Sequence, residues 1–393
     1  PLEHIHHGSV EGDVITDVGQ DLHPQEGEAY YDLGEQILMP GLINAHCHLD
    51  YTEFKGSVFP GKGFSSWIKS INAIKSSFSP EDYVAAIQKG IDLSLNAGCT
   101  SIFNIEAFPD LLLKLPVPPL RIWWFLELID VRSRMHSIED VMGAFSFFEN
   151  NPDWLGGFGL SPHAPYTSSI ELYRLAKHCA EELNMPVTTH IAESNEEQSM
   201  FLHAEGPLYE FLKDLGRNTD DCGHGSPLSH LFEFGLIPEK MICVHLNYLQ
   251  DQDWEWIQAQ PLTIVHCPKC HTFFEHQPFE FEALKKAGCK ILLGTDSMAS
   301  NDGLDLRSEC RMFRESHPDV SAEELIKMIT CEPAAAIGLN ETLGVLRPGA
   351  LADLVSFPDG HSDPYEGVIQ SKASPGFVMV NGKMVRDVNT KDA

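Results

Sequence analysis

The sequence predicts an α/β fold, a (β/α)8 TIM barrel with a small β-sandwich formed by the N- and C-terminal segments. Three observations lead to this prediction. The middle of the chain alternates short apolar runs with stretches of helical periodicity. Residues that can bind metals or carry protons stand at the ends of these runs. Both ends of the chain have the pattern of β-structure, with short apolar runs separated by turns.

The predicted strands are short runs of β-branched or other apolar residues. They are Leu42–His46, Thr100–Asn104, Arg121–Glu127, Gly156–Pro162, Pro186–His190, Met241–His245, Leu262–His266 and Lys290–Asp296. The helices predicted between them have apolar residues at helical spacing, and the first opens with a Ser79 cap. They are Pro80–Ala97, Ser168–Asn184, Asn195–Leu215, Asp251–Gln260, Phe279–Gly288 and Leu304–His317. Eight strands that alternate with helices favour a closed parallel barrel.

A histidine, carboxylate or amide stands at or just past the C-terminal end of every predicted strand. These residues are His46, Asn104, Glu127, His163, His190, His245, His266 and Asp296. In a barrel the carboxyl ends of all strands meet at one face, where the active site is built. An open, doubly wound sheet gathers its ligands at one switch point instead. The spread over eight strands therefore favours the barrel.

The two flanks of the chain contain short apolar runs between glycines and acidic turns. Near the C-terminal end, Asn381-Gly382 separates Val-Met-Val from Lys-Met-Val, which is a strong signal for a two-residue hairpin. We expect residues 1–39 and 345–393 to form the two parts of one small β-sandwich. Residues 40–344 then form the barrel.

The chain has 393 residues and carries 27 Lys and Arg against 57 Asp and Glu, a formal net charge of -30. Such a surface repels a phosphate backbone and an anionic bilayer, so we expect neither nucleic acid nor a membrane as a partner. No apolar run of about 18 residues and no signal peptide is found. The ten cysteines are dispersed, which predicts reduced thiols in a cytoplasmic protein.

The segment Pro40–His48 ends in His-Cys-His. Residues two apart on a strand point to the same side, so His46 and His48 can reach one ion. The alternative is a pair of partly exposed loop histidines. Their place at the end of the first predicted strand favours metal binding.

Three further strand ends complete a candidate ligand set. His190 ends one strand and Glu193 follows three residues later, while His245 and Asp296 end two others. Imidazole and carboxylate donors suit Zn²⁺ or Fe²⁺, and a position left open for water marks a catalytic site. Each residue alone has a plain alternative, because a buried histidine can be a satisfied core residue and Asp296 can cap a helix. Their joint occurrence at strand ends favours one metal centre.

Seven segments carry a family resemblance. They are Pro40–His48, Ser161–Thr167, His190–Ser194, Val244–Leu246, His266–Pro268, Gly294–Ser297 with Ala299–Asn301, and Leu346–Leu354. On these segments, which are spread over nearly the whole chain, the sequence resembles the metal-dependent amidohydrolase superfamily. The similar branch holds cytosine, guanine and adenosyl-type deaminases and triazine chlorohydrolases. His190–Ser194, followed by Glu196 and Glu197, also resembles the aminodeoxyfutalosine deaminases.

The resemblance implies a metal-dependent hydrolytic deaminase that releases ammonia from an amino-purine or an adenine nucleoside-like substrate. The implied ligands of one divalent ion, Zn²⁺ or Fe²⁺, are His46, His48, His190 and Asp296. A bound divalent ion lowers the pKa of its water from ~15.7 to ~7, which supplies a metal-bound hydroxide as the nucleophile. Asp296 can accept the proton of that water, His245 can orient the hydroxide, and Glu193 can protonate a ring nitrogen and the departing ammonia.

Other interpretations remain open at this point. A chlorohydrolase-like or amide C–N hydrolase would use the same mononuclear metal site and release chloride or an amine. A non-catalytic binding protein on a degenerate barrel would hold no metal. Glu193 could also be a solvated acid at a helix start, stabilised by the helix dipole, an interpretation that suits Glu196 and Glu197 better. A homodimer is the common default for an enzyme of this kind.

Three residues are predicted to contact a small-molecule substrate. His163 lies in a loop stiffened by prolines that resembles the substrate loop of adenosyl-type deaminases, although it could simply fix that loop. Trp67 lies in the long excursion after the first strand, where it could stack on a base or be buried in an amphipathic helix together with Ile71. Ser300 follows Asp296 in one of the family segments. Glu127 is either a pocket residue or an acid inside the barrel.

The run Cys267–His271 fits the Cys-x-x-Cys-His pattern of covalent haem attachment and contains a possible metal-binding or redox pair. No export signal and no second cysteine pair accompany it. A turn on the substrate side of the barrel is therefore the favoured interpretation. At this turn the sequence departs from the family, because Cys270 and His271 replace a usual Ser-Asn pair and His276 follows closely.

Overall fold

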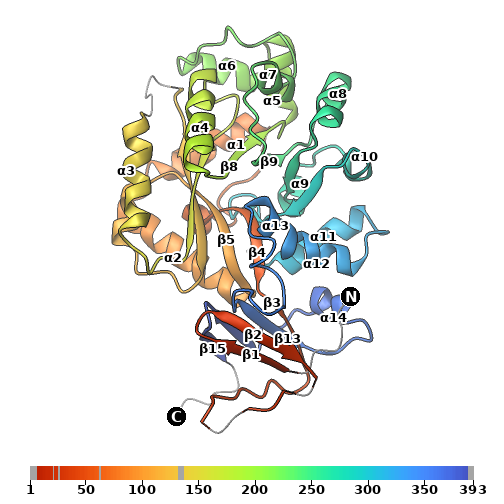
Figure 1. The fold of residues 1–393 in the computed structure, drawn as a ribbon. Coiled ribbons are helices and arrows are strands. Elements are labelled where there is room, and N and C mark those ends of the chain that lie inside the picture. Colours follow the sequence, from red (N-terminus) through yellow and green to blue (C-terminus); the bar gives the residue numbers. More distant parts are fainter. Residues whose placement is uncertain (1–6, 21, 25–26, 62, 132–136, 388–393) are drawn as a thin grey trace.

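The fold is described from a computed structural model, which covers residues 7–20, 22–24, 27–61, 63–131 and 137–387. Its centre is a sheet in the order β11-β10-β9-β8-β7-β6-β5-β4-β12, in which all pairs are parallel. The short strand β12 follows β11 after two residues and pairs with β4. The last strand therefore returns to the first, and the sheet closes into a barrel surrounded by helices (Figure 1).

The barrel strands are β4 (Leu42–His48), β5 (Cys99–Glu106), β6 (Arg121–Leu128), β7 (Gly156–Pro162), β8 (Val187–Ile191), β9 (Met241–His245), β10 (Thr263–His266), β11 (Lys290–Leu293) and β12 (Asp296–Ser297). Every predicted strand overlaps one of them. The predicted (β/α)8 barrel is confirmed. Because the strands are parallel, their carboxyl ends meet at one face, where the polar residues identified above are brought together.

The helices are α1 (Phe64–Lys75), α2 (Pro80–Asn96), α3 (Ile138–Glu149), α4 (Ile170–Leu183), α5 (Asn195–His203), α6 (Pro207–Asp214), α7 (Pro227–Glu233), α8 (Asp251–Ala259), α9 (Pro268–Phe273), α10 (Phe281–Lys286), α11 (Leu306–Ser316), α12 (Ala322–Met328), α13 (Cys331–Ala336) and α14 (Pro364–Gln370), with 3-10 turns η1 (Leu49–Phe54) and η2 (Pro109–Lys114). The Ser79 cap of α2 is confirmed, because its hydroxyl accepts a hydrogen bond from the backbone N–H of Asp82.

The prediction of one continuous helix over Asn195–Leu215 is wrong. Helix α5 ends at Ala204, which takes a left-handed conformation with φ 51°. Gly206 then adopts φ 101°, a conformation that glycine tolerates best, and Pro207 starts α6. The apolar spacing continues through the break, which explains why periodicity alone joined the two helices.

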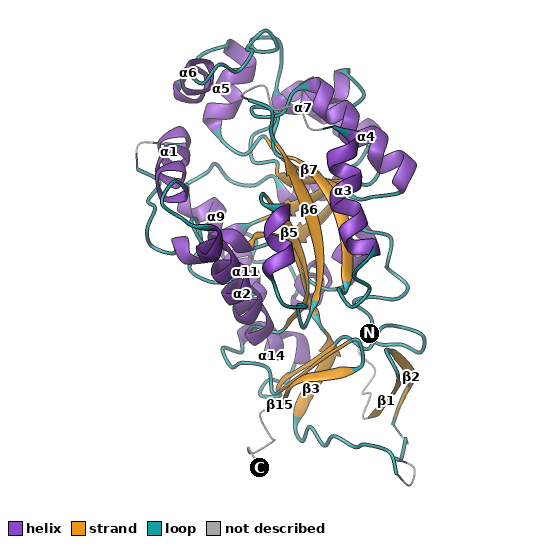
Figure 2. Cartoon of the chain, turned by 90° about the vertical axis from the view of Figure 1, so that its left-hand side faces the viewer, coloured by secondary structure: helices purple, strands orange, loops and turns teal. Residues whose placement is uncertain are grey.

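Both ends of the chain contribute to a small β-structure beside the barrel (Figure 2). It consists of a two-stranded sheet, β1 (His7–Glu11) and β2 (Val14–Gly19), and a four-stranded antiparallel sheet of β3 (Gln36–Pro40), β13 (Leu354–Pro358), β14 (Phe377–Val380) and β15 (Lys383–Asp387). The two sheets share an apolar core of Ile15, Ala350, Ala352, Leu354, Phe377 and Met379. The predicted joining of the two termini is confirmed.

The hairpin predicted at Asn381-Gly382 is also present, since Val380 pairs with Lys383 and both turn residues have positive φ, 53° and 70°. The division of the chain at residues 1–39, 40–344 and 345–393 stays a prediction. Residues 1–6 and 388–393 within those ranges lie outside the described residues.

A buried ion pair joins the barrel to the small β-structure. At the start of β6, Arg121 donates from Nε to Asp353 Oδ2 at 2.6 Å and from Nη2 to Asp353 Oδ1 at 3.2 Å. Asp353 Oδ1 also accepts the backbone N–H of Asn381 at 2.8 Å, in the hairpin turn. One carboxylate therefore connects a barrel strand to the C-terminal hairpin.

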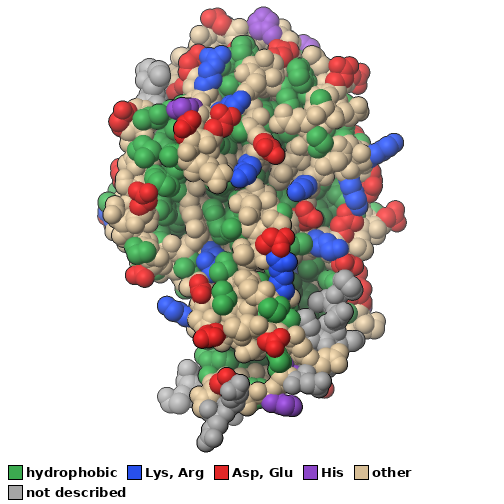
Figure 3. All heavy atoms as spheres, viewed as in Figure 1, with side chains coloured by type: hydrophobic (Ala, Val, Ile, Leu, Met, Phe, Trp, Pro, Cys, Tyr) green, Lys and Arg blue, Asp and Glu red, His purple; other side chains and the backbone are tan. Residues whose placement is uncertain are grey.

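The surface carries the acidic excess of the sequence. Asp and Glu side chains are scattered over the whole face seen in Figure 3. Within the described part of the chain, every helix is too short or too polar to cross a bilayer. The ten cysteines are unpaired thiols, and all but Cys331 are buried.

Candidate metal centre and active site

Residues from four strands converge at the carboxyl face of the barrel. Strand β4 alternates its side chains, so that His46 and His48 point to the same side. The Nε2 atoms of both histidines lie near Asp296 Oδ1, at 3.6 Å and 3.7 Å. His48 Nε2 also lies 3.3 Å from His190 Nε2 of β8. All four predicted ligands therefore come together, as the sequence predicted.

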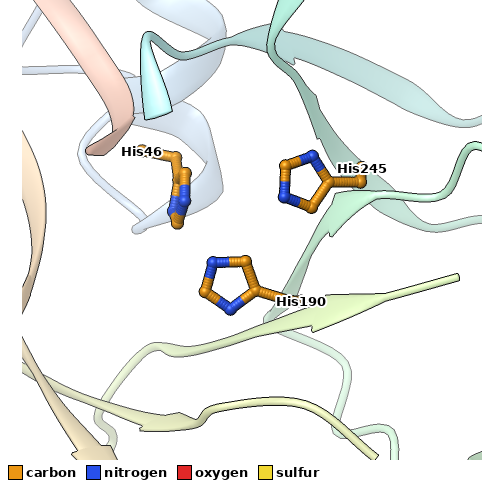
Figure 4. A group of neighbouring side chains, drawn as sticks. All are labelled: His46, His190 and His245. Carbon is orange, nitrogen blue, oxygen red and sulfur yellow. The ribbon is translucent and has the colours of Figure 1, made fainter. Parts of the chain in front are cut away.

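Two overlapping groups of donor atoms can hold an ion at this place. One group is His46, His190 and His245, and the other is His46, His48 and Asp296; within each, the donor atoms lie within 4.8 Å of one another and are buried. Figure 4 shows His46, His190 and His245 with their imidazole rings facing a common point. The predicted site residues from β4, β8, β9 and β12 thus form one centre.

Unpartnered nitrogens support a cation at this centre. Among the described residues, His46 Nε2 and His245 Nε2 are buried and have no hydrogen-bond partner. A buried polar atom without a partner costs about 1–3 kcal/mol, so native structures seldom leave one without reason. A divalent ion would satisfy both the lone pairs and the carboxylate. The residues present therefore fit the implied metal.

Neighbouring groups orient the candidate ligands. His190 Nδ1 lies 2.9 Å from the backbone carbonyl of His163, which makes Nδ1 the donor and leaves the Nε2 lone pair free. Ser300 donates its hydroxyl to Asp296 Oδ2 at 3.2 Å, which leaves Oδ1 facing the histidines. Such contacts hold a metal ligand in its binding orientation.

The electrostatics favour the protonation states that a metal needs. Burial lowers the pKa of His48 and His190 well below the ordinary value, and it lowers the pKa of His245 to about 3. Burial alone would raise the pKa of Asp296, but the nearby imidazole of His46, together with those of His245 and His48, holds it well below its ordinary value. Neutral imidazoles beside an ionised carboxylate form a ligand set that is ready to bind a cation.

Two of these residues have an unusual backbone. His245 has φ 77° and Asp296 has φ 55°, in the left-handed region that non-glycine residues seldom adopt. Such conformations cost about 1–3 kcal/mol each and persist where the surrounding structure imposes them, often at functional sites. The strain therefore coincides with the residues to which the sequence assigned chemistry.

Glu193 lies at the same centre as a buried acid. The residue is 4 % exposed, and its Oε1 is 3.6 Å from His245 Nε2. Burial raises the pKa of Glu193 well above its ordinary value, and Asp296 and Glu197 raise it further. The environment therefore favours the protonated form of this carboxyl group. The interpretation of Glu193 as a solvated acid does not fit this burial.

Glu197 requires a correction. The sequence suggested a solvated acid at a helix start, but the residue is fully buried. Its Oε2 accepts the backbone N–H of Glu193 at 2.7 Å, which fixes the turn between β8 and α5. Burial raises the pKa of Glu197 to about 8. Glu196 lies closer to the surface and accepts the backbone N–H of Ser65 at 3.1 Å.

A cavity of about 610 Å³ opens beside the metal centre. His48, His190, Glu193 and Asp296 line it on the side of the metal centre, and η1, α1, α6 and the loops after β5, β6 and β7 also contribute to its wall. Of the predicted substrate contacts, Trp67 and His163 line the cavity. Trp67 is buried in α1 together with Ile71, as one of its two alternatives predicted, and its stacking on a base stays a prediction. Ser300 does not line the cavity and instead contacts Asp296.

Several cavity residues were missed by sequence reasoning. Glu127, left open between two interpretations, lines the cavity. So do Tyr51, which stacks on His48 with ring centroids 5.4 Å apart, and Lys75, whose Nζ donates to Tyr51 Oη at 2.8 Å. The one available signal was position, since Tyr51 comes three residues after His48 and Lys75 ends the helix that contains Trp67.

The Cys-x-x-Cys-His run forms the start of α9. The described residues contain no ligand group that joins Cys267, Cys270 and His271. His271 Nδ1 lies 3.1 Å from Asn247 Oδ1, and His271 belongs to none of the donor groups found among the described residues. Cys270, in contrast, lies beside Glu193 and His245. The segment is a turn at the active face of the barrel.

The chain is similar to several known proteins along most of its length. A curated relative from Pyrococcus furiosus, a 5-methylthioadenosine/S-adenosylhomocysteine deaminase, is 28 % identical over 362 residues, which cover 88 % of this chain and 80 % of the relative. The structure of Helicobacter pylori aminofutalosine deaminase in complex with methylthio-coformycin superimposes with a TM-score of 0.80 at 21 % identity, covering 96 % of this chain and 94 % of that one.

A second similar structure is atrazine chlorohydrolase from Arthrobacter aurescens, complexed with zinc, with a TM-score of 0.80, 20 % identity, and coverage of 97 % of this chain and 90 % of that one. At these identities the two structures show the fold alone. The sequence profile of the amidohydrolase family matches residues 37–385, nearly the whole described chain. This match confirms the resemblance found in the sequence. The chain belongs to the amidohydrolase family.

Proposed function

We propose that the protein is a metal-dependent hydrolase that deaminates an adenine nucleoside and releases ammonia. One observation carries the proposal: the buried carboxyl group of Glu193, whose pKa burial raises, lies at the same face as a cluster of buried His and Asp side chains that can bind an ion, next to a cavity of about 610 Å³. The names of the similar proteins, a methylthioadenosine deaminase and an aminofutalosine deaminase, support the same reaction.

The proposed ligands of one divalent ion are His46, His48, His190 and Asp296. Zn²⁺ is the favoured ion and Fe²⁺ the alternative, since imidazole and carboxylate suit both. When bound, such an ion lowers the pKa of a water molecule and makes it a nucleophile at neutral pH.

The side chains of this protein handle the protons. Asp296 is held ionised, so that its carboxylate can take the proton of the attacking water. His245 stays neutral and can hydrogen-bond to that water, because its Nε2 has no other partner. Glu193 carries a proton that it can give to a ring nitrogen of the base, and it can deliver a proton to the amino group as ammonia leaves.

The cavity suits a nucleoside better than a free base. Its wall includes the aromatic rings of Phe64 and Trp67, which pack at 5.8 Å and can accommodate a flat heterocycle. The wall also includes the ammonium of Lys75 and the side chain of Glu127, which provide a hydrogen-bond donor and an acceptor. Sugar hydroxyls can use both. His163 also lines the cavity, and burial lowers the pKa of its imidazole.

An ammonia-release screen tests the proposal. Zinc-loaded and iron-loaded protein is incubated with adenosine, 5′-deoxyadenosine, methylthioadenosine, S-adenosylhomocysteine, adenine and a chlorinated triazine. We expect ammonia and the 6-oxopurine product from at least one nucleoside. Release of chloride from the triazine without ammonia from any purine would support the chlorohydrolase alternative.

Metal analysis provides a second, independent check. Asp296→Ala is expected to lose both activity and bound metal, measured by elemental analysis after dialysis, while the matched Asp302→Ala, an exposed acid six residues later, keeps both. A fully active Asp296→Ala enzyme would contradict the mechanism.

A further inference from the structure

We propose a second cation site beside the first, formed by Cys270, His245 and Glu193, which binds a thiophilic divalent ion and inhibits the enzyme. The site itself does not depend on the proposed function. The inhibition does, because it requires that Glu193 and His245 act on protons.

The three side chains already have the spacing of a ligand set. One donor atom from each, a thiol sulfur, an imidazole nitrogen and a carboxylate oxygen, lies within 4.8 Å of the other two. All three residues are buried, with exposures of 1 %, 3 % and 4 % for Cys270, His245 and Glu193. Among the described residues, His245 Nε2 has no hydrogen-bond partner, and it lies 3.6 Å from Glu193 Oε1.

The thiol reaches this point because of the local fold. Strand β10 ends at His266, and Pro268 begins α9 one residue after Cys267. Cys270 therefore lies in the first turn of α9 and faces the centre of the barrel mouth, while the backbone N–H of His271 closes the turn on the carbonyl of Cys267 at 2.8 Å. This donor set contains none of the four ligands proposed for the first ion, although His245 also belongs to the group with His46 and His190.

The donor set selects the chemistry of the ion. Thiolate, imidazole and carboxylate together bind Zn²⁺ in a tetrahedral arrangement with one place open for water, and the sulfur favours softer ions such as Cd²⁺. Hard ions such as Mg²⁺, which prefer oxygen donors, are not expected to bind. On binding, the thiol of Cys270 and the carboxyl group of Glu193 each release one proton to solvent as the sulfur–metal and oxygen–metal bonds form.

An ion at this site would remove two groups from the reaction. Glu193, once coordinated, has no proton to give to the base, and the lone pair of His245 is no longer available to the attacking water. Activity should therefore rise as the first site fills and fall again at higher zinc or cadmium concentrations.

The test uses full-length protein that has been loaded with one equivalent of Zn²⁺ and is then titrated with Cd²⁺ in the absence of substrate. Ultraviolet absorption of the thiolate-to-cadmium charge transfer reports sulfur coordination, and elemental analysis after equilibrium dialysis reports the stoichiometry. We expect a second ion and a charge-transfer band in the wild-type protein. In Cys270→Ser the band should disappear. Loss of a residue that only hydrogen-bonds to a metal ligand lowers metal affinity by about 10–100-fold, so loss of the ligand itself should lower affinity for the second ion by more than that.

Cys267→Ser is the matched control, because Cys267 is equally buried in the same turn but joins none of the donor groups formed by the described residues. This variant should bind the second ion and be inhibited by it like the wild type. Glu193→Gln gives a second measurement, since it should weaken Cd²⁺ binding without removing a thiol. Equal binding by wild type and Cys270→Ser, or loss of the band in Cys267→Ser, would overturn the proposal.

The two hypotheses fail in different ways. If no purine is deaminated but Cd²⁺ binds through Cys270, the proposed function fails and the second site stands. If nucleosides are deaminated and the wild-type protein binds no second ion, the second site fails and the proposed function stands.

Discussion

Glu193 and Asp296 are two buried carboxyl groups whose pKa values are displaced in opposite directions. Burial raises the pKa of Glu193, whereas imidazoles around Asp296 overcome burial and keep that group ionised. Two acids in one site can therefore serve as proton donor and proton acceptor at the same pH. This division of roles depends on neighbours and not on residue type, since both groups are carboxylic acids.

Replacing Glu193 by Gln should remove the proton donor and leave the metal ligands in place. We expect kcat to fall by about 10²–10⁴-fold, the usual contribution of a general acid, with unchanged zinc content. Steady-state kinetics and elemental analysis on the same preparation check this. A variant that loses activity and zinc together would assign Glu193 to the metal instead.

Glu197 should make the protein less stable as the pH rises. Its pKa is about 8 in the folded protein and 4.5 ordinarily, so between these values the folded state holds a proton that the unfolded chain has released. That stabilisation is complete below pH 4.5 and is lost as the pH rises through about 8. Calorimetry should show that the Tm of wild type falls relative to that of Glu197→Gln as the pH rises through this window. Glu196→Gln, at the less buried neighbour, is the control and should show no such trend.

At the scale of elements, the barrel was predictable because its strands carry their own signal. Runs such as Arg121–Leu128 are buried along nearly their whole length, so their apolar composition identifies them without knowledge of the fold. The convergence of the candidate ligands was predictable for the same reason, because each one lies at or near the end of such a run. Helix breaks and caps depend on single residues, and the break at Gly206 was missed.

The cavity wall could not be predicted in the same way. Lys75 and Glu127 are polar residues whose role depends on which elements pack beside them, and that information is absent from local periodicity. Cys270 could be identified as unusual, but its distance from Glu193 and His245 follows only from the closed barrel. Burial of Glu197 is likewise a tertiary property.

The junction between β11 and β12 should be sensitive to a single methyl group. A Cβ added to Gly294 would lie 2.9 Å from both the Cβ and the carbonyl oxygen of His46. Gly294→Ala should therefore displace His46 and weaken metal binding, although no donor atom is removed; we expect a loss of at least about 10-fold, measured by competition with a chelator. Gly303→Ala, where the new methyl group meets nothing within 4 Å, is the matched control and should bind metal normally.

At the scale of the whole molecule, the pair of Arg121 and Asp353 connects the barrel to the terminal sheets. Asp353→Asn would leave a buried guanidinium without its counter-charge, which destabilises proteins by about 3–5 kcal/mol. Chemical denaturation should show this loss. Glu53→Gln, which breaks the exposed pair with Lys89 at 2.8 Å, should change the free energy of unfolding by at most about 1 kcal/mol. Equal effects would mean that the buried pair is not a structural connection.

The net charge of -30 describes the surface of the protein and not the electrostatics of the proposed active site. The charges are spread over the face in Figure 3, whereas the proposed chemistry takes place at buried groups whose field is set by their neighbours. The prediction that nucleic acids and membranes are not partners stays a prediction. A small nucleoside remains compatible with the charge.

The contact that closes the barrel, between β12 and β4, contains proposed metal ligands, so metal binding should stabilise it. The last strand meets the first through only two residue pairs, Asp296 with Cys47 and Ser297 with His48, and two of those four residues are proposed metal ligands. An ion that binds Asp296 and His48 would join the two strands that close the barrel. Hydrogen exchange at residues 295–297 should therefore slow on zinc loading, while exchange in β6 should change less. At a free metal concentration 100-fold above Kd, the slowing should correspond to at most about 2.7 kcal/mol.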